Sequence, residues 1–168
     1  GEGLDYAIRF GDGAWHGTQA DRIMDAPMSV MCSPALAHGL RTAADLARQP
    51  LLRSYRTDEW TAWFEAAGAP CPVVRGAVFD SSLTLAEAAA QGAGMALLPV
   101  KMFARELQQG RLAQPFAQEL HRGAYWLTRL QSRPATEAMT AFRDWLLAQA
   151  SAGAGGSTGS STSAEKLE

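Results

Sequence analysis

The stretch from Val78 to Pro99, VFDSSLTLAEAAAQGAGMALLP, constrains the fold more than any other part of the chain. A short apolar strand leads into Asp80-Ser81-Ser82, and the residues that follow have the apolar spacing of a helix. Gly92 and Gly94 end that helix, and an apolar run follows from Met95 to Leu98. We therefore predict a strand–helix–strand unit with hydroxyl groups at the first junction. In α/β sheets such a junction is a common binding site for small polar ligands.

The hydroxyls at this junction have three possible roles. Asp80 or Ser81 could simply cap the helix, whose first turn leaves several backbone N–H groups without partners. The same groups could bind a ligand, and capping and binding can coexist. A catalytic serine is the least favoured role, because Phe79, Asp80 and Leu83 stand where a Gly-x-Ser-x-Gly elbow would need other residues.

Composition excludes several classes of function. The net charge of −2 offers no basic surface for nucleic acid, so we expect no DNA binding by this chain itself. No apolar run approaches the ~20 residues that cross a membrane, and no signal peptide is visible. Cys32 and Cys71 lie far apart, which favours two reduced thiols in a cytoplasmic protein. The three histidines are too widely separated to predict a metal site, and we expect no cofactor.

The chain divides into a foldable part and a tail. Residues 150–164 consist of Gly, Ser, Thr and Ala, a composition that cannot bury enough apolar surface to offset its ordering entropy. We predict a flexible tail over 150–168 and interpret its last four residues as a vector-encoded remnant. The remaining part, about 150 residues, is enough for one domain or two small lobes.

Strands and helices are predicted to alternate along the foldable part. This alternation predicts a mostly parallel sheet with helices on both faces. The expected strands cover residues 4–10, 28–31, 51–54, 77–79, 95–98, 112–116 and 124–130, and the expected helices cover 34–38, 42–47, 57–67, 82–91, 100–109 and a last segment after Pro134.

Further candidate residues lie at strand ends or on helix faces. Trp60, Trp63 and Phe64 have helical spacing and are predicted to be core. Tyr125 and the next residue, Trp126, must point to opposite faces of a strand, so one of them can face a cleft. In another strand, Arg53 and its neighbour Ser54 could reach the same kind of crevice, although solvated loop positions are the more ordinary interpretation.

Five motifs in order resemble the effector domain of LysR-type transcriptional regulators. They are LDYAIRFGDG, SVMCSPAL, LLRSYRTDEWTAWFEAAG, DSSLTLAEAAAQGAGMALLP and GAYWLTRLQSRPATEAMTAFRDWLLAQ. The third and fifth are most similar to the branch of that family that regulates glycine cleavage and inducible β-lactamase. The resemblance covers residues 1 to about 149.

This resemblance implies an α/β fold, a two-lobed periplasmic-binding-protein-like (type 2) effector domain. Residues 1–25 and 129–149 would belong to lobe I, and residues 26–128 would form lobe II. The family's effector domain has further strands and a helix ahead of the first strand seen here, so the N-terminal part of lobe I is expected to be missing. A winged helix-turn-helix would likewise lie upstream and would carry promoter DNA binding.

The resemblance also implies a function. The expected protein is a non-enzymatic, cytoplasmic sensor, a homo-dimer or tetramer, that controls β-lactamase genes. Its effectors would be a UDP-MurNAc-peptide, favouring repression, and anhydro-MurNAc-peptides, favouring activation. Ser82 and Tyr125 are the positions carried over from the family, and Ser81, Asp80 and Arg53 complete the predicted ligand-binding set. The alternatives are a solute-binding protein of a transport system and a small α/β hydrolase that uses Ser82.

Overall fold

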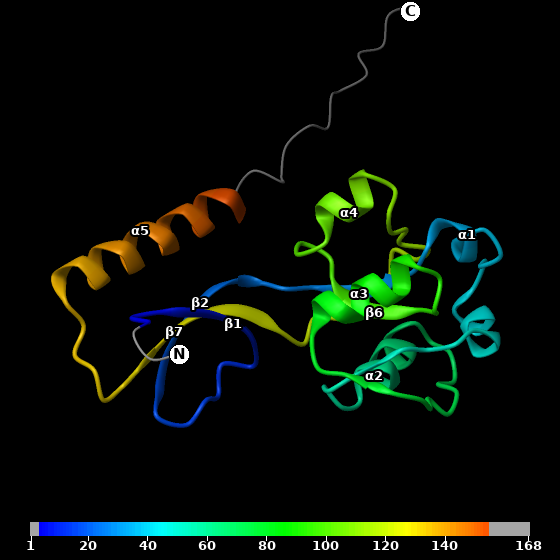
Figure 1. Ribbon diagram of the computed structural model, residues 1–168, viewed down its shortest axis with the longest axis horizontal. Coiled ribbons are helices and arrows are strands. Elements are labelled where there is room, and N and C mark those ends of the chain that lie inside the picture. The colour runs from blue at the N-terminus through cyan, green and yellow to red at the C-terminus, as the bar shows by residue number, and fades with distance from the viewer. Residues whose placement is uncertain (1–3, 155–168) are drawn as a thin grey trace, which may run out of the picture. The chain divides into compact units, whose positions relative to one another are not determined.

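The computed structural model describes residues 4–154 (Figure 1). Contacts within the chain define two compact units. Unit 1 contains the residues up to Asp25 and those from Gly123 onward, and unit 2 is Ala26–Arg122. The chain therefore passes from one unit to the other twice. The assignment of these units to lobes I and II of a complete effector domain stays a prediction.

Unit 1 is an antiparallel sheet with one long helix against it. Strand β7 (Ala124–Leu130) lies between β1 (Ala7–Gly11) and β2 (Thr18–Asp25), and both neighbours are antiparallel to it. Helix α5 (Glu137–Ala154) runs along this sheet and contacts β2 (Figure 1). Leu127 of β7 and Met139 of α5 are buried. The helix thus covers the part of the sheet next to β2, while Phe142 and Trp145 of the same helix stay exposed.

A paired arginine and aspartate tie α5 to β2. The guanidinium of Arg143 donates from Nε and Nη2 to the two carboxylate oxygens of Asp21, at 2.7 and 2.6 Å. This two-point geometry is the strong form of an ion pair. The hydrogen bond from Arg143, more than its charge, lowers the pKa of Asp21 below the ordinary carboxyl value, against a smaller opposing effect of burial. The charged form of Asp21 is therefore favoured in the folded protein.

Replacing Arg143 by methionine is expected to lower the free energy of unfolding by about 1 kcal/mol at neutral pH, because the pair is only partly shielded from solvent. A lowered pKa stabilises the fold above the unfolded pKa of aspartate, and the effect is lost as pH falls through the folded pKa. The difference between wild type and R143M in urea unfolding should therefore shrink on acidification. Asp144→Asn is the matched control, since Asp144 contacts the same arginine from an exposed position. A difference that grows on acidification would contradict the pairing.

Unit 2 is built on short strands joined by single bridges. Strand β3 (Met28–Met31) is antiparallel to β6 (Ala96–Pro99), and β4 (Arg53–Ser54) is parallel to β5 (Val78–Phe79). A parallel bridge between Leu51 and Met95 joins the two pairs. The carboxyl ends of β4 and β5 consequently lie at one edge, where ligand sites form in α/β sheets.

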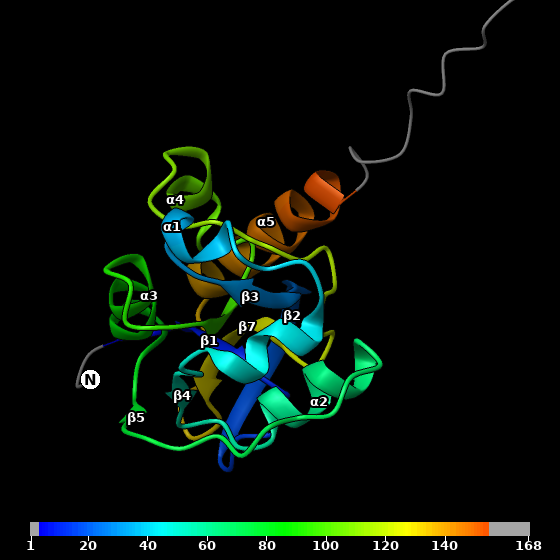
Figure 2. The ribbon, with the colours of Figure 1, turned by 90° about the vertical axis from the view of Figure 1, so that its right-hand side faces the viewer.

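The helices of unit 2 pack around these strands (Figure 2). Their apolar residues form the buried core, in which Trp63, Phe64 and Leu85 are among the largest side chains. The prediction that the Trp60, Trp63 and Phe64 stripe is core is confirmed. The helices are α1 (Pro34–Ala37), the 3-10 helix η1 (Ala43–Arg48), α2 (Glu59–Ala66), α3 (Ser82–Ala90) and α4 (Ala104–Gln108).

Several expectations from the sequence are wrong. The sheets are mainly antiparallel, not mainly parallel, and β2 was not predicted at all. The strand expected at 112–116 is reduced to one bridge at Ala113, and the helix expected at 100–109 is limited to α4. Helix α5 continues to Ala154, so the first residues of the predicted tail are helical. The rest of that tail, 155–168, lies outside the described residues.

Candidate ligand-binding site

The two serines at the start of α3, Ser81 and Ser82, have different roles. Ser81 occupies the N-cap position, and its hydroxyl oxygen accepts a hydrogen bond of 3.1 Å from the backbone N–H of Leu83. This is the capping role that the sequence left open. Ser82 is the first residue of the helix and is half-buried. Capping is thus done by Ser81, and the hydroxyl of Ser82 is left at the junction for other contacts.

A second polar group lies at the end of β4, the neighbouring strand. The Ser54 hydroxyl donates a 2.9 Å hydrogen bond to the Glu59 carboxylate. The Nε–H of Arg56 donates to the other oxygen of the same carboxylate. Asp58, which lies between Arg56 and Glu59 in the sequence, has a left-handed backbone conformation (φ +62°) at the N-cap of α2.

Arg56 connects the ends of the two parallel strands. One of its terminal nitrogens, Nη2, lies 3.5 Å from the Ser82 hydroxyl oxygen, at the long limit of a hydrogen bond. The other, Nη1, donates to the Tyr55 hydroxyl at 3.3 Å, and the guanidinium lies 5.0 Å from the centre of the Tyr55 ring. Arg56 therefore presents a cation beside the hydroxyl that the sequence singled out.

The Arg56–Glu59 pair is largely withdrawn from solvent. The exposed fractions of the two side chains are 15% and 12%. Burial raises the pKa of Glu59 above the ordinary carboxyl value, and Arg56, Ser54 and Arg122 partly oppose that effect by favouring the charged form. The carboxylate is thus held in place by specific partners rather than by solvent.

A cavity of about 380 Å³ opens beside this pair, within unit 2. Its wall combines charged and apolar groups, as ligand pockets commonly do. The charged residues are Arg53, Arg56, Asp58 and Glu59, and the others are Leu52, Ser54, Thr57, Trp60, Thr61, Cys71, Pro72, Val73, Val74, Leu85 and Leu97. The cavity is therefore large enough for part of a polar ligand next to Arg56.

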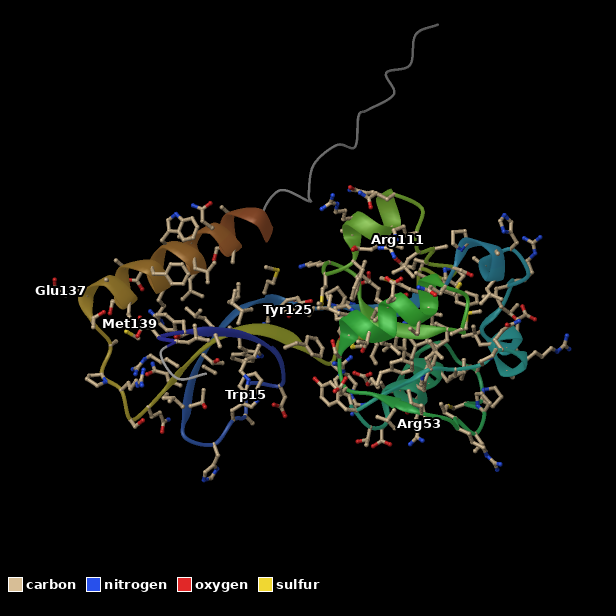
Figure 3. The ribbon with its side chains drawn as sticks, in the orientation of Figure 1. Trp15, Arg53, Arg111, Tyr125, Glu137 and Met139 are labelled. Carbon is tan, nitrogen blue, oxygen red and sulfur yellow. The ribbon has the colours of Figure 1, made fainter. Side chains whose placement is uncertain are left out.

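The other predicted site residues lie around this centre or in unit 1. Asp80 is exposed immediately before α3. Arg53, which is labelled in Figure 3, donates to the backbone carbonyl of Gly76 at 3.0 Å and is one of the residues that line the cavity. Tyr125 belongs to β7 of unit 1, where its ring meets that of Phe10 edge-on at 5.8 Å. The ligand-binding roles of all five predicted residues stay predictions.

Sequence analysis missed Arg56 and Glu59. Glu59 is an acid in the first turn of α2, where the helix dipole favours it, and this is a sufficient local explanation for the residue. The available signal was the spacing of Arg56 and Glu59, three residues apart, directly after a strand that ends in Ser54. The meaning of that spacing depends on β5, which comes more than twenty residues later and brings Ser82 to the same edge.

Metal and thiol chemistry have no support within residues 4–154. No group of three His, Cys, Asp or Glu side chains in this range could hold a metal ion. Cys32 and Cys71 are both free thiols, and burial raises the pKa of Cys32 to about 11. The same range has no helix with the length and apolarity needed to span a membrane.

Comparison with known proteins identifies the family. The LysR substrate binding domain matches residues 1–151, and the chain belongs to this family. It is 57% identical to the HTH-type transcriptional activator AmpR of Pseudomonas aeruginosa over 157 residues, which are 92% of this chain and 53% of that protein. The chain spans about half the length of the curated relatives that it matches.

Solved structures confirm the fold. The effector domain of Pseudomonas aeruginosa AmpR superposes with a TM-score of 0.86 at 57% identity, covering 92% of this chain and 75% of that one. A Citrobacter freundii effector binding domain with three amino-acid substitutions gives 0.83 at 49% identity, covering 89% and 76%. The predicted periplasmic-binding-protein-like (type 2) α/β fold is therefore confirmed. The relatives are named as transcriptional regulators, which favours neither a transport protein nor a hydrolase.

Proposed function

We propose that this chain is the ligand-sensing part of a transcriptional regulator that binds a peptidoglycan-derived muropeptide and thereby controls β-lactamase expression. The observation that carries the proposal is the pairing of a half-buried arginine with the Ser82 hydroxyl at the carboxyl ends of β4 and β5, in a chain of the LysR family. The ligand is a UDP-MurNAc-peptide in the repressing state and an anhydro-MurNAc-peptide in the activating state.

The chemistry of a muropeptide suits these groups. It carries carboxylates, amides and hydroxyls. Arg56 and the amino-terminal end of α3 favour anions, and the Ser82 hydroxyl can donate or accept. Tyr125 offers a ring face and a hydroxyl, both of which suit a polar ligand. Ser81, Asp80 and Arg53 are neighbouring positions from which the same ligand can be reached.

The substituted relative supports the choice of Ser82 and Tyr125. In the Citrobacter freundii variant, a threonine, a serine and a tyrosine are replaced by valine, alanine and phenylalanine. The replaced serine and tyrosine are separated by the same number of residues as Ser82 and Tyr125. Each replacement removes a hydroxyl and little else, which is the change expected at a site that binds through hydroxyl groups.

Control of transcription then requires that the two ligands differ in their affinity for two states of the regulator. A ligand shifts an equilibrium only by that difference. Promoter DNA is bound by a helix-turn-helix outside this chain, in a cytoplasmic homo-dimer or tetramer. The net charge of −2 agrees with a chain that does not itself contact DNA.

Isothermal titration of the complete regulator with UDP-MurNAc-pentapeptide and with anhydro-MurNAc-tripeptide tests the proposal. We expect saturable binding of both at one shared site, so that each competes with the other. Failure of both ligands to bind to folded protein would refute the muropeptide assignment.

Removal of either hydroxyl should weaken that binding without unfolding the protein. We expect Ser82→Ala and Tyr125→Phe each to lower muropeptide affinity by about 5- to 30-fold, the effect of one lost hydrogen bond to a polar ligand. Ser132→Ala and Tyr6→Phe are matched controls, because they make the same chemical changes elsewhere and should leave affinity unchanged. Equal loss of thermal stability with unchanged affinity would instead assign Ser82 and Tyr125 a structural role.

A further inference from the structure

The Arg56–Glu59 pair has features that its structural role does not require. Glu59 already accepts a hydrogen bond from the Ser54 hydroxyl. One contact with a cation is then enough to compensate the charge of this buried carboxylate. Arg56 makes that contact with its Nε–H. Its two terminal nitrogens are turned toward Tyr55 and Ser82, at the edge where β4 and β5 end.

We propose that Arg56 binds a carboxylate of the ligand through its terminal nitrogens, with Glu59 and Ser54 as the residues that position it. The proposal rests on the proposed function and deepens it, because it requires the ligand to carry a free carboxylate. Arg56 is then a contact residue of the site, and Glu59 acts through Arg56.

The hydrogen-bond lengths support this division of roles. The contacts of the terminal nitrogens with the Tyr55 and Ser82 hydroxyls are 3.3 and 3.5 Å. A guanidinium bound to a carboxylate makes bonds of about 2.7–2.9 Å, often two in parallel. A ligand carboxylate can therefore bind these nitrogens through shorter and stronger bonds than the Tyr55 and Ser82 hydroxyls do. The Glu59 bond at Nε remains in place and fixes the plane of the guanidinium.

The burial of Arg56 makes this site selective for anionic ligands. The Arg56 side chain is only 15% exposed, so its attraction for an anion is weakly screened by water and salt. The charged groups around Glu59 are Arg56 and Arg122, and the further charged residues of the cavity wall are Arg53 and Asp58. Asp58 and Arg122 are both exposed, so solvent screens their charges and leaves Arg56 and Arg53 beside Glu59. The cations thus outweigh the buried carboxylate, which favours an acidic ligand over a neutral one.

The test compares UDP-MurNAc-pentapeptide with the same compound after amidation of its stem-peptide carboxylates, titrated into the complete regulator. We expect amidation to lower affinity for the wild-type protein by about 10- to 100-fold, the range for a hydrogen-bonded charge. Arg56→Met should lose about as much affinity for the acid form and should no longer distinguish acid from amide. Arg56→Lys keeps the charge without the two-nitrogen geometry, and should bind the acid more weakly than wild type while still distinguishing the two ligands.

Arg111→Met is the matched control. Arg111 forms the same kind of pair with Glu87, at 2.8 Å, but both side chains are half exposed and neither lines the cavity beside Arg56. Figure 3 shows Arg111 and Arg53 on different sides of unit 2. We expect R111M to leave both affinities unchanged. If R56M does not fold, R56K decides the question.

The outcomes separate the two proposals. If wild-type protein binds neither form, the muropeptide assignment fails, and the role of Arg56 fails with it. If wild type binds both forms equally, or if R56M binds and still prefers the acid, muropeptide sensing stands and the assignment of Arg56 is wrong. A Glu59→Gln variant that keeps the preference but binds both forms more weakly supports the positioning role, and one that abolishes the preference contradicts it.

Discussion

Replacing Gly94 by alanine is expected to lower the free energy of unfolding by about 2–4 kcal/mol. An added Cβ would lie 2.3 Å from the Pro50 carbonyl oxygen and 3.0 Å from its Cβ, and the backbone φ of +156° is unfavourable for a side chain. The contact cannot relax easily, because the same carbonyl accepts a 2.8 Å hydrogen bond from the Met95 N–H. Urea unfolding of wild type and G94A measures the effect.

Gly39→Ala provides the control for G94A. A Cβ at Gly39 meets nothing within 4 Å, and its backbone is not left-handed, so stability should stay within about 0.5 kcal/mol of wild type. Equal stability of G94A and G39A would contradict the close approach of the chain at Pro50. The close approach at Pro50 brings Leu51 and Met95 together in the bridge that joins the β4 segment to β6. It therefore also sets the position of β4 and of Arg56, which follows it.

Sequence patterns correctly predicted the strands and helices whose own residues show which side is buried. The strands Met28–Met31 and Ala124–Leu130 have the predicted bounds, and the segment from Val78 to Pro99 forms β5, α3 and β6 as expected. In each case an apolar run or a helical spacing lies within the element itself. The two glycines near the end of α3 serve the turn into β6, as the sequence indicated.

Features that depend on distant parts of the chain were not predictable in this way. The sequence of β2, TQADRIMD, lacks a strict alternation of apolar and polar residues, and its pairing with β7 shifts between Arg22 and Met24. Strand direction is decided by the path of the whole chain, so the antiparallel pairing of β3 with β6 was missed. The same limit applies to the site. Ser82 was predicted as a candidate from its junction, but Arg56 became a candidate only when the structure placed β4 and β5 side by side.

Replacing Trp63 by alanine is expected to lower the free energy of unfolding by about 3–5 kcal/mol, the largest effect of any single change considered. Trp63 is fully buried. Its ring lies 5.4 Å from that of Phe64 and 5.7 Å from that of Phe116, and its Nε1–H donates a 3.2 Å hydrogen bond to the Gln118 carbonyl. Alanine leaves a cavity in place of these contacts, since a packed interior relaxes only in part.

Trp145→Ala is the matched control, because it removes the same atoms from a side chain that is 58% exposed. It should cost less than about 1 kcal/mol, and a loss equal to that of W63A would show that Trp63 does not anchor the core. Trp63 is one turn along α2 from Glu59, so the tryptophan that fixes this helix in the core also fixes the carboxylate that positions Arg56. We therefore expect any fraction of W63A that stays folded to bind the acid and the amide forms more weakly while still preferring the acid, as expected for loss of the Glu59 position.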